Sequence, residues 1–134
     1  MTKFVGLNFS IKLSKNWCFA DDGEVYSFFN PSGSGVLQIS VYIKDAGINN
    51  DEILDFIEIE YRENLKTTKY GDFDGFELIY IEDEANKFWR KLWLKNDELL
   101  LFITYNCNSE DSEYEITLID DMLSSLERIR LNKK

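Results

Sequence analysis

Histidine is absent from this chain, and cysteine occurs only twice. Histidine is the side chain that most often transfers protons near neutral pH and binds zinc, so its absence excludes a Cys–His nucleophile and a histidine-bound metal. Cys18 and Cys107 have no metal-binding spacing, and we expect them to be small buried hydrophobic residues. The sequence therefore predicts neither an enzyme nor a cofactor, although a carboxylate-dependent hydrolase stays open among the twenty-five acidic residues.

Long apolar runs are also missing. Polar residues interrupt residues 1–20, so this stretch lacks the hydrophobic core of a signal peptide. No run elsewhere approaches the length that a membrane-spanning helix needs. From these absences we expect a cytoplasmic protein that does not insert into a membrane.

The composition that remains is that of a folded protein. Hydrophobic residues make up 44% of the chain and aromatic residues 15%, which is far from the composition of a disordered segment. Its 134 residues correspond to a single domain, residues 1–134, that buries roughly two-thirds of its unfolded surface.

Negative charge dominates the chain. Twenty-five acidic residues against fifteen basic ones give a net charge of −10. Such a charge disfavours nucleic acid and anionic membranes as partners. It favours solubility, or a protein partner that is basic.

The most regular part of the sequence lies between residues 76 and 107. Three runs rich in β-branched and aromatic residues are separated by short polar breaks, which predicts an antiparallel meander of three strands: Phe76–Glu82, Phe88–Leu94 and Leu99–Cys107. Apolar residues occupy both faces of the middle strand. A sheet with one solvated face would alternate apolar and polar residues. The sheet is therefore expected to be covered on both faces or to present an apolar surface to a partner.

The rest of the chain alternates between strand and helix patterns. Further strands are predicted at Leu7–Leu13 and Thr67–Phe73, and a hairpin at Val25–Asn30 and Val36–Ile43. Helices are predicted from Asn50 or Asp51 to Lys66 and from Ser112 to Asn132, and Asp74–Gly75 has the sequence of a tight turn. This order predicts an α+β fold, a mostly antiparallel β-sheet of about six strands with two main helices packed on it.

The middle strand of the meander supplies the candidate site. Trp89, Lys91, Trp93 and Lys95 fall on one face of that strand, and two aromatic residues with a basic rim are typical of a protein interface. In the alternative, both tryptophans pack under the first helix and the two lysines extend to its edge. Neighbouring strands add Tyr80 and Tyr105 to the candidate surface if the register brings them to the same face.

Patterns of apolar spacing spread over nearly the whole chain: they lie at Phe9–Trp17, Val36–Val41, Gly75–Tyr80, Leu99–Tyr105 and Met122–Leu126. In these segments the chain resembles the PsbP-like superfamily, which includes the extrinsic subunit P of photosystem II and the yeast Ran-binding Mog protein. The resemblance implies an antiparallel sheet with helices on its faces. It also implies a non-enzymatic protein-binding module that acts as an adaptor, an assembly factor or a secretion chaperone.

Another class of function fits the charge. Some immunity proteins are small and acidic and neutralise a basic toxin, and the acidic stretches Asp51–Glu63 and Glu110–Asp121 would suit such a role. The partner is a protein both for a binding module and for an immunity protein. The identity of that partner and the oligomeric state do not follow from the sequence.

Overall fold

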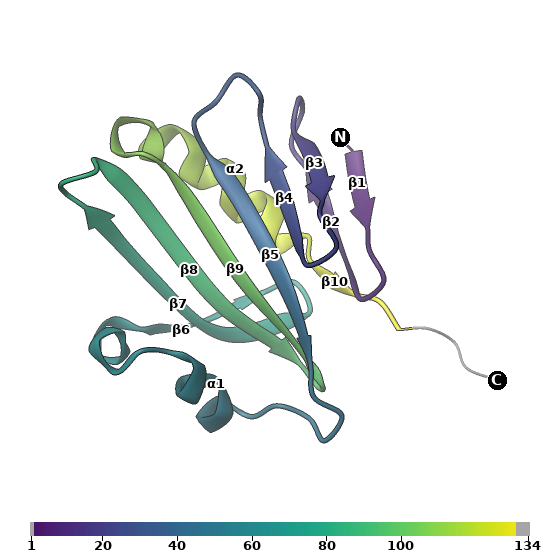
Figure 1. Cartoon of the computed structure of the whole chain (residues 1–134). Coiled ribbons are helices and arrows are strands. Elements are labelled where there is room, and N and C mark those ends of the chain that lie inside the picture. Colours follow the sequence, from purple (N-terminus) through teal and green to yellow (C-terminus); the bar gives the residue numbers. More distant parts are fainter. Residues whose placement is uncertain (1, 131–134) are drawn as a thin grey trace.

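The computed structural model describes residues 2–130, which form two antiparallel β-sheets and a few short helices (Figure 1). The larger sheet has seven strands in the order β3-β4-β5-β9-β8-β7-β6, and the smaller has three in the order β1-β2-β10. The strands are β1 Thr2–Val5, β2 Phe9–Leu13, β3 Cys18–Asp21, β4 Val25–Phe29, β5 Val36–Ile43, β6 Lys66–Tyr70, β7 Phe73–Glu82, β8 Lys87–Asn96, β9 Leu99–Asn108 and β10 Glu127–Arg128. The helices are α1 Asn50–Phe56, the 3₁₀ helices η1 Ile59–Asn64 and η2 Ser109–Asp111, and α2 Ser112–Ser124.

The predicted meander forms the centre of the large sheet. Strands β7, β8 and β9 pair antiparallel over almost their whole lengths, and the predicted hairpin of β4 and β5 joins them through β9. The α+β fold is therefore confirmed, with one strand more in the main sheet than the sequence suggests and a second small sheet beside it.

One face of the large sheet is covered by α2 and the small sheet (Figure 1). The main hydrophobic core lies between them and includes fully buried residues from β2, β5, β9 and α2, such as Phe9, Leu37, Ile103 and Leu123. Trp17 and Cys107 join this core. Cys18 is exposed, so the expectation that both cysteines are buried is wrong for Cys18. Within residues 2–130, no helix combines the length and the apolar character that crossing a membrane requires.

Of the described residues, α1 and η1 cover the opposite face, and they lie in front of one end of the sheet (Figure 1). A smaller hydrophobic cluster holds them there, and we call it the second cluster. Ile53 and Ile57 are its fully or almost fully buried members from the helix, and they pack against Trp93 and Leu100 of the sheet. Both faces of the sheet are thus covered, but the second face only in part.

The predicted helix from residue 50 to Lys66 is wrong in its length. Asn49 caps α1 in a reciprocal arrangement with Glu52, but α1 ends at Phe56 because Ile57 adopts an extended conformation. The Arg62 guanidinium of η1 donates to the carbonyl oxygens of Leu54 at 2.8 Å and Ile57 at 3.3 Å. The Ile57 N–H also donates to the Leu54 carbonyl oxygen at 3.0 Å. Together these bonds provide the last carbonyl groups of the helix with donors and stabilise its end.

The predicted C-terminal helix is also too long. Helix α2 ends at Ser124, and the Ser125 hydroxyl donates to the Met122 carbonyl at 2.6 Å while it accepts the Lys12 amide at 2.8 Å. The chain then pairs with β2 as β10, where an uninterrupted helix was expected. The last predicted residues of that helix, 131 and 132, lie outside the described residues.

The N-terminal and central turns differ from the predictions as well. The predicted strand from Leu7 begins only at Phe9, and the strands β1 and β3 were not expected. The tight turn falls at Gly71, not at Asp74–Gly75, which lies inside β7. Gly71 has φ +58, and a β-carbon there would lie 2.0 Å from the Leu126 carbonyl oxygen, so this turn requires glycine.

Candidate functional site

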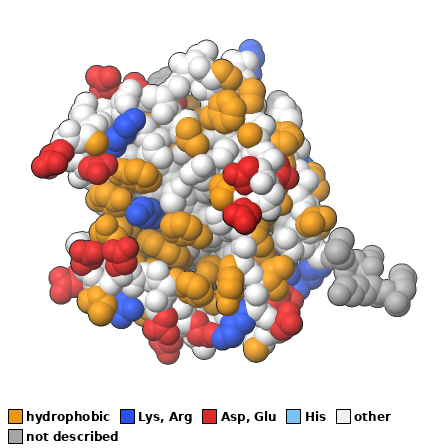
Figure 2. Space-filling model, in the orientation of Figure 1, with side chains coloured by type: hydrophobic (Ala, Val, Ile, Leu, Met, Phe, Trp, Pro, Cys, Tyr) orange, Lys and Arg blue, Asp and Glu red, His pale blue; other side chains and the backbone are white. Residues whose placement is uncertain are grey.

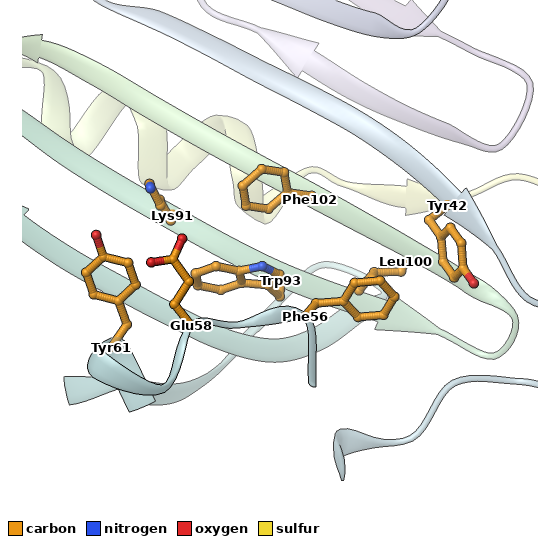
Figure 3. A pocket seen from close by; sticks show the side chains of 8 residues that line it. All are labelled: Tyr42, Phe56, Glu58, Tyr61, Lys91, Trp93, Leu100 and Phe102. Carbon is orange, nitrogen blue, oxygen red and sulfur yellow. The ribbon is translucent and has the colours of Figure 1, made fainter. Parts of the chain in front are cut away.

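A groove opens on the partly covered face of the large sheet, where α1 and η1 meet the strands. We call it the α1 groove, and its volume is about 320 Å³. Apolar and aromatic side chains line most of it: Tyr42, Phe56, Glu58, Tyr61, Lys91, Trp93, Leu100 and Phe102. Phe56, Glu58 and Tyr61 form one wall of the groove. Figure 3 shows that this wall stands in front of the strands that carry the other five residues.

Strand register builds the floor of the α1 groove. Trp93 of β8 pairs with Phe102 of β9, and Leu100 of β9 pairs with Tyr42 of β5. Paired residues in antiparallel strands point to the same face, so these four side chains form one continuous apolar surface. The Trp93 and Phe102 rings have their centroids 5.5 Å apart.

The break after α1 positions the wall that faces this floor. Because the helix stops at Phe56, Ile57 turns into the second cluster and Phe56 stays at the surface. The Phe56 ring meets Tyr42 edge to face, with the centroids 5.4 Å apart. Phe56 is 52% exposed, Tyr42 47% and Phe102 36%, so the groove presents three aromatic rings to solvent.

A second depression adjoins the α1 groove on the far side of the Tyr42–Phe56 contact. We call it the side hollow, and its volume is about 210 Å³. It shares Tyr42 and Phe56 with the groove, and an ion pair between Lys44 and Glu52 lies in its wall. The two depressions form a strip of apolar surface interrupted by one aromatic ridge.

An aromatic stack borders the other end of the α1 groove. The rings of Tyr61, Tyr80 and Trp89 follow one another at 6.0 and 6.3 Å with nearly parallel planes. The Lys91 ammonium lies 5.6 Å from the centroid of each ring, within the range of a cation–π interaction. The indole N–H of Trp89 donates to Glu82 at 3.2 Å, which fixes the outer ring of the stack.

Acidic residues follow the exposed side of α1 and η1. Asp55, Glu58, Glu60 and Glu63 are all exposed, and we call them the acidic border. A hydrogen bond with Glu58, together with its negative charge, raises the pKa of Glu60. Figure 2 shows acidic side chains beside a surface where hydrophobic side chains gather around a basic one.

The structure separates the residues that the sequence proposed for the site. Tyr80, Trp89 and Lys91 lie together at one end of the groove. Trp93 is only 6% exposed and belongs to the second cluster beneath the first helix, while one side still lines the groove. The alternative placed both tryptophans there, but Trp89 is not part of that cluster. Tyr105 lies on the opposite face, 1% exposed, and its hydroxyl donates to Glu115; it adds nothing to the candidate surface.

Sequence reasoning missed the most exposed groove residues. Tyr42 falls at a polar position of an alternating strand, and Phe102 lies within an uninterrupted apolar run. Phe56 falls inside the longer helix that the sequence predicts up to Lys66. The alternation at Tyr42 was the one available signal, because a large aromatic side chain at a solvent-facing strand position requires an explanation.

The groove contains no arrangement typical of a metal site. Among residues 2–130, no group of three or more His, Cys, Asp or Glu side chains is placed to hold a metal ion. The groove itself offers one carboxylate, one ammonium group and the phenols of Tyr42 and Tyr61. Its chemistry is that of apolar contact with a few polar groups at the edges.

Comparisons with known proteins identify the fold. No family model and no curated protein matches the sequence. A crystal structure of a protein from Bacteroides thetaiotaomicron matches at TM-score 0.73 and 19% identity over 96% of this chain and 48% of that one, so the chain spans about half the length of that protein.

Two further solved structures match over most of both chains. Cyanobacterial PsbP from Synechocystis matches at TM-score 0.67 and 13% identity, with 96% of this chain and 92% of that chain covered. LpqN of Mycobacterium tuberculosis, described as involved in cell envelope biogenesis, matches at TM-score 0.63 and 9% identity, with 91% and 83% covered. These likenesses confirm the PsbP-like fold that the sequence resemblance implies.

Proposed function

We propose that this domain is a non-enzymatic protein-binding module, of the adaptor, assembly-factor or secretion-chaperone kind, and that a segment of its partner occupies the α1 groove. The observation that carries the proposal is the solvent exposure of Tyr42, Phe56 and Phe102 around one apolar floor. Exposed apolar side chains are unremarkable when scattered, but a contiguous group of them marks an interaction surface. Aromatic residues are also those that contribute most to the affinity of protein interfaces.

The fold supports an accessory role. The similar structures include a PsbP and a protein described as involved in cell envelope biogenesis, and neither description names a catalytic activity. Function depends on the site and not on the fold, so these neighbours do not identify the partner.

The proposal is tested by affinity capture from a lysate of the native organism, followed by mass spectrometry. The chain offers a closely matched pair of variants. Phe56→Ser removes an exposed ring that meets Tyr42 at 5.4 Å, and Phe19→Ser removes a 51% exposed ring that meets Phe4 at 4.9 Å, on β3 at one edge of the sheet. We expect a protein that the wild type and Phe19→Ser retain and Phe56→Ser loses. The same proteins on all three baits would contradict the proposal.

A second candidate function is an antidote to a basic toxin. The exposed acidic border favours it, because opposite charges speed the association of two proteins. The distinguishing observation is a toxin gene next to the gene for this chain. A globular basic partner whose binding survives Phe56→Ser would favour the antidote over the adaptor.

A further inference from the structure

The acidic border forms no ion pair with a basic side chain among residues 2–130. The segment from Asp55 to Glu63 has four acidic residues and a single basic one, Arg62. The Arg62 guanidinium donates to the carbonyl oxygens of Leu54 and Ile57, at the end of α1. The ion pairs formed among residues 2–130 include none of the four carboxylates.

The border also lies directly against the apolar surface. Glu58 lines the α1 groove, and Asp55 lines the side hollow. The Glu58 side chain raises the pKa of Glu60, first through hydrogen bonding and then through the repulsion between the two negative charges. A cation placed at this edge would relieve that repulsion and, at the same time, lie within reach of the groove.

We infer that the partner segment in the α1 groove is cationic and amphipathic: its aromatic or branched apolar side chains enter the groove and the side hollow, and its lysine or arginine side chains meet the acidic border. This inference rests on the proposed function and adds the chemistry of the partner. The one cation that lines the groove, Lys91, already lies beside three aromatic rings. A fatty acid or another anionic apolar molecule would also bring its negative charge toward Asp55 and Glu58. The aromatic ridge of Tyr42 and Phe56 between two hollows suits apolar side chains spaced along a peptide.

The test is a selection from a phage-displayed library of random peptides against the purified protein. Four variants run in parallel with the wild type. Phe56→Ser tests the groove, and Phe19→Ser is its control. A border variant combines Asp55→Asn, Glu58→Gln and Glu60→Gln. A charge control combines Glu24→Gln, Glu84→Gln and Glu113→Gln, which removes as many exposed acidic side chains away from α1 and η1.

We expect the wild type, Phe19→Ser and the charge control to enrich the same peptides, rich in aromatic and branched residues with an excess of lysine and arginine. Phe56→Ser should not enrich them. The border variant should bind the best of these peptides about tenfold more weakly, the sum of a few exposed charge pairs. The difference between wild type and border variant should shrink as the screening length falls from about 10 Å at 0.1 M salt to about 3 Å at 1 M.

The outcomes separate the inference from the proposed function. Peptides that depend on Phe56 but carry no basic excess, or that bind the border variant equally well, overturn the inference and leave the groove as the binding site. Peptides that bind Phe56→Ser as well as Phe19→Ser, or the absence of any enriched peptide, overturn both. An equal loss of affinity in the border variant and the charge control would show only an effect of net charge, and it too overturns the inference.

Discussion

The Tyr42 and Phe56 rings meet edge to face with their centroids 5.4 Å apart, although one belongs to a strand of the large sheet and the other is the last residue of α1. Each ring is about half exposed. The contact therefore joins the wall of the α1 groove to its floor without burying either ring completely. The groove exists only while α1 remains docked on the sheet, so its shape depends on the second cluster beneath it.

The first prediction concerns Trp93, which we expect to stabilise the fold as part of the second cluster. It is 6% exposed and packs among Ile53, Ile57 and Leu100. Trp93→Ala should lower the free energy of unfolding by roughly 3–5 kcal/mol through lost burial and a cavity. The melting temperature should fall by more than about 10 °C for a domain of this size.

The control for that change is Phe102→Ala, which removes a neighbouring ring that is 36% exposed. The melting temperature of Phe102→Ala should fall by clearly less than that of Trp93→Ala. If both variants melt at the wild-type temperature, Trp93 is not a core residue and its place in the second cluster must be reconsidered.

The second prediction concerns the buried charge on the other face of the sheet. Arg90 is buried and forms ion pairs with Glu77, which is also buried, and with Asp120, while it donates to the Tyr70 hydroxyl at 2.6 Å. Arg90→Met leaves the buried Glu77 carboxylate with the Tyr70 hydroxyl but without its cationic partner, which should cost about 3–5 kcal/mol of stability. Urea unfolding of this variant measures the loss.

The double variant Glu77→Gln/Arg90→Met provides the check. Because it removes both charges, it should be more stable than Arg90→Met alone. Equal stability of the single and double variants would mean that the ion pair is not what makes Arg90 important.

The third prediction is a loss of stability in alkaline solution. Burial, followed by the hydrogen bond to Glu115, strongly raises the pKa of Tyr105 in the folded protein. The unfolded chain then releases this proton first, above about pH 10, while the folded chain keeps it. Stability is therefore complete below that pH and falls above it, by up to about 1.4 kcal/mol per pH unit.

Tyr105→Phe should lessen this alkaline slope in unfolding curves recorded on both sides of about pH 10. It should also lower stability at neutral pH, because the buried Glu115 loses the hydroxyl that donates to it. Tyr42→Phe removes a half-exposed phenol and serves as the control. An unchanged slope in Tyr105→Phe would contradict the role assigned to its burial.

The sequence predicted the centre of the fold well because its signals there are local. The runs from Phe76 to Cys107 are rich in β-branched and aromatic residues and break at short polar stretches, and the strands of the meander follow them closely. Long-range contacts decide the parts that were predicted wrongly. The helix after Asn50 stops because Arg62 returns to its end, and α2 stops where Ser125 meets the amide of Lys12.

The candidate site could be predicted only in part. The sequence places Trp89, Lys91 and Trp93 on one face of a strand, and that placement is correct. It does not tell how far a helix covers that face, so it could not separate the buried Trp93 from its more exposed neighbours. The register between β8 and β9 sets the face of Tyr105, and no local pattern encodes that register.

The central claim is that a protein partner occupies the α1 groove, and site-specific photo-crosslinking tests it most directly. A photoreactive phenylalanine analogue replaces Phe102, which lines the groove, or Phe19, on β3 at one edge of the sheet, and each protein is irradiated in a native lysate. We expect a discrete crosslinked protein from position 102 that is lost when Phe56→Ser is added, and none from position 19. Crosslinks that are the same from both positions, or that persist in Phe56→Ser, would contradict the claim.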